Sequence, residues 1–217
     1  MASRRHPQSA TRTPAGRPTP AELERRKLRV LEVATDLFVE QGYAGTSFVE
    51  IARAAGVGSN LIYQHFGDKE QLFREVIFAR RTNAMEDAPR YEPGDSLRDA
   101  LMRMARYAID ISLRPRTLGL MRLIIAESQR FPEMMRAVAD KTMNHLLNNF
   151  SALLDDLVAA GLTDIGDTQQ AARLYMDIIL GMVPLRAYAN WEVARPGDAE
   201  LALKVEVFIR GVLRSQP

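Results

Sequence analysis

The sequence predicts an all-α protein, and three observations lead to that prediction. Apolar residues recur at intervals of three and four along most of the 217 residues, which is the spacing of one face of an α-helix. Prolines and glycines stand where these runs begin and end. We find no sustained alternation of apolar and polar residues that would favour strands, and no internal repeat of solenoid length.

The bulk composition is that of an ordinary globular protein, with 47% hydrophobic and 26% charged residues. No apolar run approaches the length of a membrane span, and no apolar segment follows the basic N-terminus, so we expect neither a membrane helix nor a secretory signal. The absence of cysteine excludes disulfides, thiolate metal sites and cysteine nucleophiles, and it suits the cytoplasm. We expect no metal and no cofactor.

Residues 1–19 form a basic tail that we expect to be disordered, because it is rich in Arg, Pro, Ser and Thr. Residues 1–30 carry eight Lys or Arg and two acidic residues, although the whole chain has a net charge of only +2. A basic end on a near-neutral body is expected of a protein that binds a polyanion. A solvated tail without a partner explains the same charge, so both interpretations stay open.

The first helix is expected from Pro20 to about Gly42. Thr19 is suited to cap it, Pro20 to occupy its first position, and Gly42 to end it in the left-handed conformation. The apolar residues that share one face of this helix are Leu23, Val30, Ala34, Leu37 and Phe38.

Residues 46–73 have the packing pattern of a helix-turn-helix. A short helix over 47–54 ends near Gly56, which supplies the positive φ of a tight turn, and a second short helix follows over 58–65. The small Ala52, four residues before Gly56, lets the two helices cross closely. An ordinary helical hairpin has the same spacing, so this pattern alone does not establish DNA binding.

The remaining chain is expected to be helical as well. Its predicted helices begin after Asp68 and at Pro115, and extend over 95–113, from 132 to Gly161, over 167–189 and over 198–214.

Residues 24–78 resemble the TetR (TetR/AcrR) family of transcriptional regulators. The resemblance rests on LFVEQGY at 37–43, IARAAGV at 51–57, the Tyr63 and Phe66 pair, and DKExLF at 68–73. It implies a homodimer with two DNA-reading heads and C-terminal helices that pair and enclose a ligand. We therefore expect a three-helix DNA-binding domain over 20–67 and a helical ligand-binding and dimerisation domain over 68–217.

The resemblance also implies which residues meet double-stranded operator DNA. Contacts to the phosphate backbone fall on Thr46, Ser47, Tyr63, His65 and Lys69, and contacts to base edges fall on Ser59, Asn60, Leu61 and Gln64. Chemistry agrees with these assignments, because a cation at a helix N-terminus favours phosphate. Asn and Gln pair with adenine, and Leu packs on a thymine methyl group.

The recognition helix departs from the family pattern over residues 58–61. Gly58 replaces a capping serine, and Ser59 stands where members often carry a cation, so one contact is missing. Two simpler alternatives stay open, namely that Tyr63 is a core aromatic and that His65 is a packed residue at the helix end. Arginines in the tail stand close enough to the first helix to enter an adjacent minor groove.

Residues 120–138 are similar to the C-terminal domain of the AefR-like regulators, through the order R-L-x-I-A-E…R-F-P-E. Members of that group tend to control efflux or related small-molecule responses, so the resemblance implies an effector without naming it. The candidate ligand-binding residues are Met102, Arg106, Tyr107, Met121, Ile125, Met143, Tyr175 and Met176. Methionine suits an adaptable apolar pocket, although the same stripe also arises as plain core, and Arg106 or Arg122 suits either an acidic ligand group or solvent.

Broad apolar faces on the last two predicted helices suit both an internal core and a partner chain, although burial within one subunit explains them too. Trp191 is placed to border such a contact.

The sequence thus predicts a ligand-responsive transcriptional regulator, most readily a repressor that a small molecule releases from its operator. We expect no enzyme, because the three histidines are far apart in sequence and no phosphate loop or nucleophile elbow is present. The alternative is a helical protein that binds a small molecule or a partner without specific DNA binding.

Overall fold

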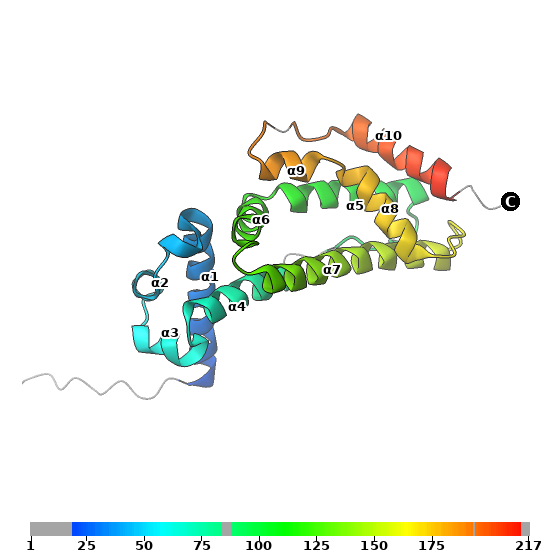
Figure 1. Ribbon diagram of the computed structural model, residues 1–217. Helices are drawn as coiled ribbons and strands as arrows, with labels where there is room; N and C mark the ends of the chain where they lie inside the picture. The colour runs from blue at the N-terminus through cyan, green and yellow to red at the C-terminus, as the bar shows by residue number, and fades with distance from the viewer. Residues whose placement is uncertain (1–18, 84–87, 193, 214–217) are drawn as a thin grey trace, which may run out of the picture.

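The computed structural model describes residues 19–83, 88–192 and 194–213, and all regular secondary structure within them is helical (Figure 1), as the sequence predicts. Residues 1–18, most of the tail expected to be disordered, lie outside these ranges. The helices are α1 (Pro20–Gly45), α2 (Phe48–Ala55), α3 (Ser59–Phe66), α4 (Lys69–Asn83), α5 (Leu97–Leu113), α6 (Pro115–Glu127), α7 (Pro132–Ala159), α8 (Thr168–Leu180), α9 (Val183–Tyr188) and α10 (Asp198–Phe208).

Helix α1 begins as its sequence predicts. Thr19 caps the helix by accepting a hydrogen bond from the Glu22 N–H, and the Glu22 carboxylate accepts one from the Thr19 N–H at 2.8 Å. This reciprocal pair satisfies backbone donors that would otherwise lack partners. Near the other end, Gly42 leaves helical geometry with φ 76°, and one short turn to Gly45 follows.

The prediction of a single helix over 167–189 is wrong. Gly181 has φ 47° and ends α8, and Pro184 lies in the first turn of the separate helix α9. Gly181 is open to a backbone conformation that helices exclude, and a proline is tolerated at a helix start but not inside one. The last predicted helix also changes character, since α10 ends at Phe208 and continues as a π-helical turn over Ile209–Leu213.

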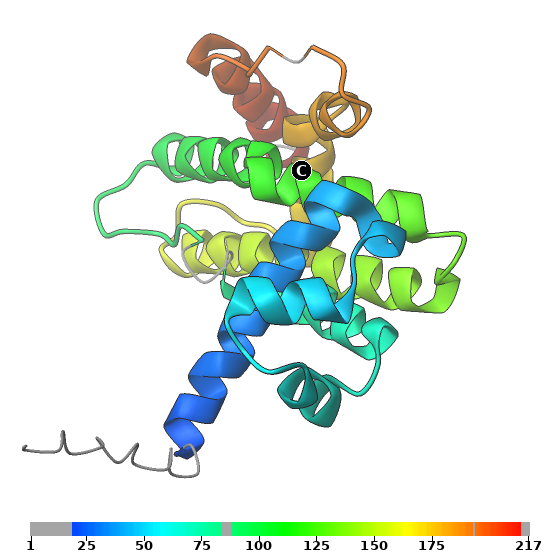
Figure 2. The same ribbon diagram turned by 90° about the vertical axis from the view of Figure 1, so that its left-hand side faces the viewer.

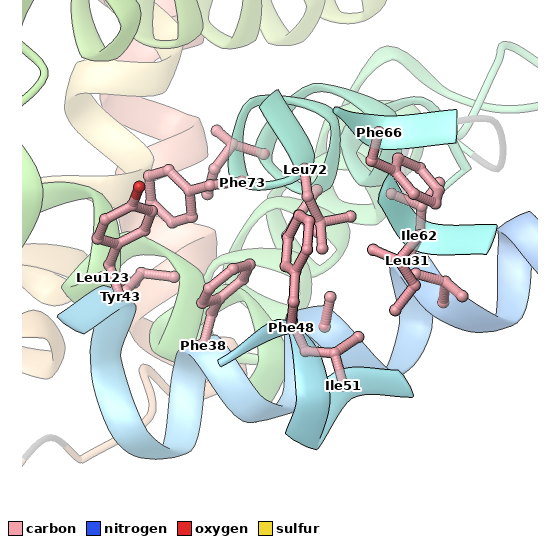
Figure 3. Packing of buried hydrophobic residues seen from close by; sticks show 14 of the residues in the cluster. Leu31, Phe38, Tyr43, Phe48, Ile51, Ile62, Phe66, Leu72, Phe73 and Leu123 are labelled. Atoms are coloured by element: carbon pink, nitrogen blue, oxygen red, sulfur yellow. The ribbon is translucent and has the colours of Figure 1, made fainter. Parts of the chain in front are cut away.

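The short helices α2 and α3 lie at one end of the molecule, and α5 and α7–α10 form a bundle at the other (Figures 1 and 2). The core beneath α1–α3 includes residues of later helices, because α4 contributes Leu72 and Phe73 and α6 contributes Leu123 (Figure 3). Helix α7 contributes Met134 and Met135 to the same core. A second core joins α5, α7, α8 and α10. The domain boundary after residue 67 stays a prediction, since α4 packs with the helices before it.

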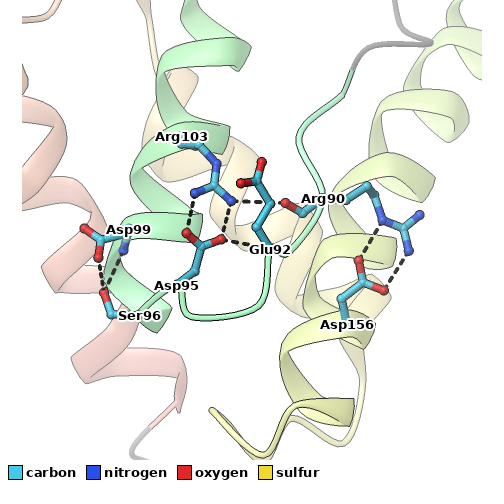
Figure 4. Close-up of polar contacts among 7 residues, drawn as sticks. All are labelled: Arg90, Glu92, Asp95, Ser96, Asp99, Arg103 and Asp156. Carbon is cyan, nitrogen blue, oxygen red and sulfur yellow. Dashed lines mark hydrogen bonds and ion pairs between the residues drawn. The ribbon is translucent and has the colours of Figure 1, made fainter.

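The connection from α4 to α5 is held by two forked ion pairs (Figure 4). Arg103 on α5 donates to both Asp95 oxygens, at 2.7 and 2.5 Å, and also to the Arg90 carbonyl. Arg90 in turn donates to both oxygens of Asp156 on α7 at 2.7 Å. Together they tie residues 90–95 to both α5 and α7. We call this segment the strap.

Candidate nucleic-acid interface

The turn between α2 and α3 has the geometry that a helix-turn-helix requires. Gly56 is left-handed, with φ 68° and ψ 34°, and Val57 N–H donates to the Ala52 carbonyl across the turn at 3.0 Å. Ala52 is only 3% exposed where the helices approach, and Ile62 is fully buried beneath α3. From α1, Arg29 Nε donates to the Ala55 carbonyl at 3.0 Å and braces the end of α2.

Helix α3 lies at the opposite end of the molecule from α8–α10 (Figures 1 and 2). Asn60, Tyr63 and Gln64 are exposed, whereas Ser59 and His65 are partly buried. Leu61 is also partly buried and packs against the first core, so only part of its side chain faces outward. Gly58 provides no side-chain cap, as the sequence predicts. The exposed groups of α3 are therefore the side-chain amides of Asn60 and Gln64 and the phenol of Tyr63.

Tyr63 is anchored yet exposed. Its ring packs edge-on against Phe48 with centroids 4.9 Å apart, and the residue remains 55% exposed. The alternative of a buried core aromatic therefore does not fit. A ring that is held in place can present its hydroxyl with little loss of side-chain entropy.

Thr46 was assigned to a phosphate, and the structure contradicts a contact through its side chain. The residue is 2% exposed, and its hydroxyl lies within hydrogen-bond distance of the carbonyls of Leu37 (3.2 Å) and Gly42 (2.9 Å). The hydroxyl is therefore turned into the end of α1, beside the non-helical Gly42. Ser47 is exposed and caps α2 by accepting from the Glu50 N–H, and a hydroxyl that accepts at a cap retains its own proton for a second bond.

Lys69 lies at the first turn of α4, but its ammonium is largely engaged within the protein. Nζ donates to the carbonyls of Tyr43 and Thr46, both at 2.9 Å, and lies 4.5 Å from the centroid of the Tyr43 ring. Burial, assisted by the Arg130 guanidinium, lowers the pKa of Lys69. An ammonium has three N–H donors, and the two carbonyls engage two of them.

Two exposed residues that the sequence analysis did not assign extend this surface. Val49, which is 67% exposed, and Arg53 lie one turn apart on α2. The sequence could have indicated both residues, because they follow the Ser47 cap and are four residues apart, and residues at that spacing share a helix face. Arg53 adds a cation to this surface, where α3 holds no Lys or Arg and where residues 19–78 hold seven Lys or Arg against nine Asp or Glu.

Comparison with known proteins agrees with this geometry. Residues 30–76 match the family described as bacterial regulatory proteins, tetR family, and residues 99–214 match the AefR-like transcriptional repressor C-terminal domain. The second match alone covers more than half of the chain. The chain belongs to the TetR family. It is thus a member of a family of DNA-binding transcriptional regulators.

Individual TetR-family relatives support the assignment. The regulator AcrR from Shigella flexneri is 31% identical over 140 residues, which span 63% of this chain and 65% of AcrR, just under two thirds of its length. A TetR-family regulator from Mesorhizobium loti has a TM-score of 0.78 at 28% identity, over 87% of this chain and 97% of that one. The flavonoid-responsive regulator FrrA has a TM-score of 0.72 at 25% identity, over 89% of this chain and 100% of FrrA.

The candidate ligand residues of this TetR-family chain do not gather in one place. Met102, Tyr107, Tyr175 and Met176 belong to the second core, whereas Met121 packs against the first. Ile125 is 52% exposed on α6. The side chain of Met143 lies outside the described residues.

Two of the ligand candidates are engaged in hydrogen bonds within the chain. Arg106 is exposed and forms a forked pair with Asp198 on α10 at 3.0 and 3.1 Å, so its guanidinium does not face the core. Tyr175 is 1% exposed and its hydroxyl donates to the Leu101 carbonyl, while burial raises its pKa. Arg122, the other cation considered for a ligand, donates to the carbonyls of Ala187 and Tyr188 at the end of α9.

Within residues 19–83, 88–192 and 194–213, no helix is long and apolar enough to cross a bilayer. In the same part of the chain, no three His, Cys, Asp or Glu side chains group as a metal site.

Proposed function

We propose that this protein is a ligand-responsive regulator, most readily a repressor that leaves its operator when a small molecule binds. One observation carries the proposal: α3 lies at the opposite end of the molecule from α8–α10 and exposes Asn60, Tyr63 and Gln64, in a chain whose residues 99–214 match a repressor domain. A major groove admits a helix of this kind. The flavonoid-responsive relative FrrA supports an organic small molecule as the effector class.

In the proposed complex, Asn60 and Gln64 read base edges, because both are exposed amides on the outer face of α3. Ser47, Tyr63 and the remaining donor of Lys69 contact the DNA backbone. These contacts position the helix but do not specify the sequence.

We further propose that the functional unit is a homodimer formed through α8–α10. Six large apolar side chains are at least 44% exposed there, namely Leu174, Met182, Leu185, Trp191, Leu203 and Val207. Leu203 and Val207 are four residues apart and share the outer face of α10, while Leu201, Val205 and Phe208 fill the chain's own core. Apolar faces of this kind are a sign of a protein interface.

The proposed switch is a change in the separation of the two heads. Paired recognition helices must span about 34–36 Å to enter successive major grooves. An effector that binds better to a conformation with another spacing shifts the population away from DNA. The proposed effector lies among the C-terminal helices near Met102, Tyr107 and Met176. Such a protein acts where the bacterial chromosome is, which is the cytoplasm, and needs neither a cofactor nor a catalytic group.

The test is a gel-shift titration of the purified full chain on DNA that flanks its own gene. We expect a discrete shifted band whose affinity falls steeply as salt rises, because phosphate contacts release counterions. A scrambled fragment of equal length and composition is the control. If both fragments bind equally weakly, the protein is a ligand- or partner-binding protein without specific DNA recognition.

A further inference from the structure

One turn of the C-terminal domain reaches into the DNA-binding end. Phe131, which immediately precedes α7, packs edge-on against Tyr43 of α1 with centroids 5.0 Å apart, and tilted against Phe73 of α4 at 5.8 Å. Its neighbour Arg130 lies with its guanidinium carbon 4.7 Å from the centroid of the Tyr43 ring. The turn is closed by Arg130 N–H and Phe131 N–H, which both donate to the Glu127 carbonyl at 3.0 Å.

The same Tyr43 ring also contacts Lys69, whose ammonium is 4.5 Å from the ring centroid. Tyr43 is 5% exposed, so the ring is held firmly between these neighbours. Lys69 also donates to the Tyr43 and Thr46 carbonyls, at the connection that leads into α2. One aromatic ring therefore links a cation from the C-terminal domain to a cation at the DNA-binding end.

We infer that Arg130 is a positioning residue for DNA binding: through its contact with the Tyr43 ring, it helps to set the position of the Lys69 ammonium. The inference rests on the proposed function, in which the remaining Lys69 donor meets a phosphate. Nothing in the family match assigns a role to Arg130.

The physical argument depends on two cations that share one ring. Each is attracted to the electron-rich ring face, and the two repel each other because both are positively charged. Lys69 is partly buried, whereas Arg130 is exposed. Lys69 is anchored by the two carbonyls, so a displacement of the Arg130 turn moves the ring and changes the field at the ammonium. Asp68, Glu70 and Glu127 are the nearby carboxylates that act on Tyr43 electrostatically. A movement of α6 and α7 therefore reaches Lys69 through the Tyr43 ring, in addition to the contact of Phe131 with Phe73 of α4.

The decisive experiment compares Arg130→Gln, Lys69→Met and the double variant in the full chain. The probe is the flanking DNA fragment and a random-sequence duplex of equal length. We expect each single variant to lower the salt slope of binding by about one phosphate contact per protomer. We expect the double variant to lose no more than either single variant, because the two residues act on one contact. Additive losses would instead mean that Arg130 touches DNA by itself and would overturn the inference.

A second measurement needs no DNA. The Lys69 side-chain resonances are followed by NMR during a pH titration of the wild type, Arg130→Gln, Arg130→Lys and the exposed control Arg136→Gln. We expect Arg130→Gln to raise the pKa of Lys69, Arg130→Lys to restore it largely, and Arg136→Gln to leave it unchanged. An unchanged Lys69 pKa in Arg130→Gln, with wild-type thermal stability, overturns the inference. A wild-type protein that fails to bind DNA refutes the proposed function and with it the role of Arg130 in DNA binding, and the NMR titration then decides only whether Arg130 acts on Lys69 through the Tyr43 ring.

Discussion

Gln64 and Lys69 are five residues apart, yet their environments differ, and we propose different roles for them at a DNA surface. Gln64 is exposed on α3, so both its amide donor and its acceptor can meet a base. Lys69 has two of its three donors engaged by backbone carbonyls and can offer one to a phosphate. The family resemblance already implies a base contact for Gln64 and a phosphate contact for Lys69, and their surroundings are consistent with that division.

We therefore predict that Gln64→Ala changes sequence preference more than overall affinity. Loss of one bidentate contact costs about 1–3 kcal/mol on the preferred base and little elsewhere. The measurement is competitive binding to a library of operator variants, with Lys69→Met as the matched variant that weakens all sequences alike. Uniform weakening by Gln64→Ala would contradict a base-reading role.

Helix α6 lies against α1 at a point that only glycine allows. A Cβ at Gly119 would overlap the Val39 Cγ1 atom, and Arg116 of α6 pairs with Asp36 of α1 at 3.0 Å nearby. Because α6 also holds α9 through Arg122, it connects the proposed dimer surface with the DNA-binding end.

At this crossing we predict that Gly119→Ala destabilises the protein by about 1–3 kcal/mol, the usual cost of overpacking. Val39→Ala in the same chain is expected to restore most of the loss, because it removes the overlapping methyl groups. Thermal unfolding of the two single variants and the double variant measures this coupling. If the double variant is as unstable as the sum of its parts, the close approach is not the cause.

From the ion pairs of the strap we predict how the free energy of unfolding changes at acid pH. The hydrogen bonds from Arg103 lower the pKa of Asp95 from 3.8 to about 2, and those from Arg90 lower the pKa of Asp156. A carboxylate with a depressed folded pKa stabilises the protein fully above its unfolded pKa and loses that contribution as pH falls through the folded value. We expect stability to fall between about pH 4 and pH 2, and Asp95→Asn to flatten this dependence in denaturant titrations. Asp140→Asn, an exposed carboxylate on α7, should leave it unchanged.

At the scale of the whole molecule, the exposed apolar side chains on α8–α10 predict assembly. We expect the double variant Leu203→Asp and Val207→Asp to be a monomer, because two buried carboxylates facing their symmetry mates are costly to desolvate. Light scattering coupled to size exclusion measures the mass. Leu28→Asp, an equally exposed leucine on α1 (60%), is the control. A wild type that is already monomeric, or a double variant that stays dimeric, would contradict this interface.

The charge distribution makes a separate prediction for the tail. Residues 1–18 carry four arginines and no acidic residue, whereas residues 19–78 have more acidic than basic residues. If the tail contacts DNA, replacing Arg4, Arg5, Arg12 and Arg17 by Ser will lower the salt slope by up to about 3.6 per protomer, at about 0.9 for each phosphate. Replacing them by Lys should preserve the slope. An unchanged slope in the Ser variant means that the tail is only solvated.

The sequence by itself determined the helices and the turn that matter most for function. Caps, first-turn prolines and left-handed glycines such as Gly56 act within four or five residues, so they can be recognised from the sequence. The same local logic was available at Gly181 and Pro184, and there we overlooked it.

Only the tertiary structure decided what each polar side chain faces. The Arg106 partner is 92 residues away and the Tyr175 partner is 74 residues away. The carbonyls that engage Lys69 are 26 and 23 residues away. Burial and hydrogen bonding depend on which distant segments pack together, and that packing cannot be read from a local sequence pattern. The sequence therefore identified the chemistry of Thr46 and Lys69, and packing determined how much of it remains available to DNA.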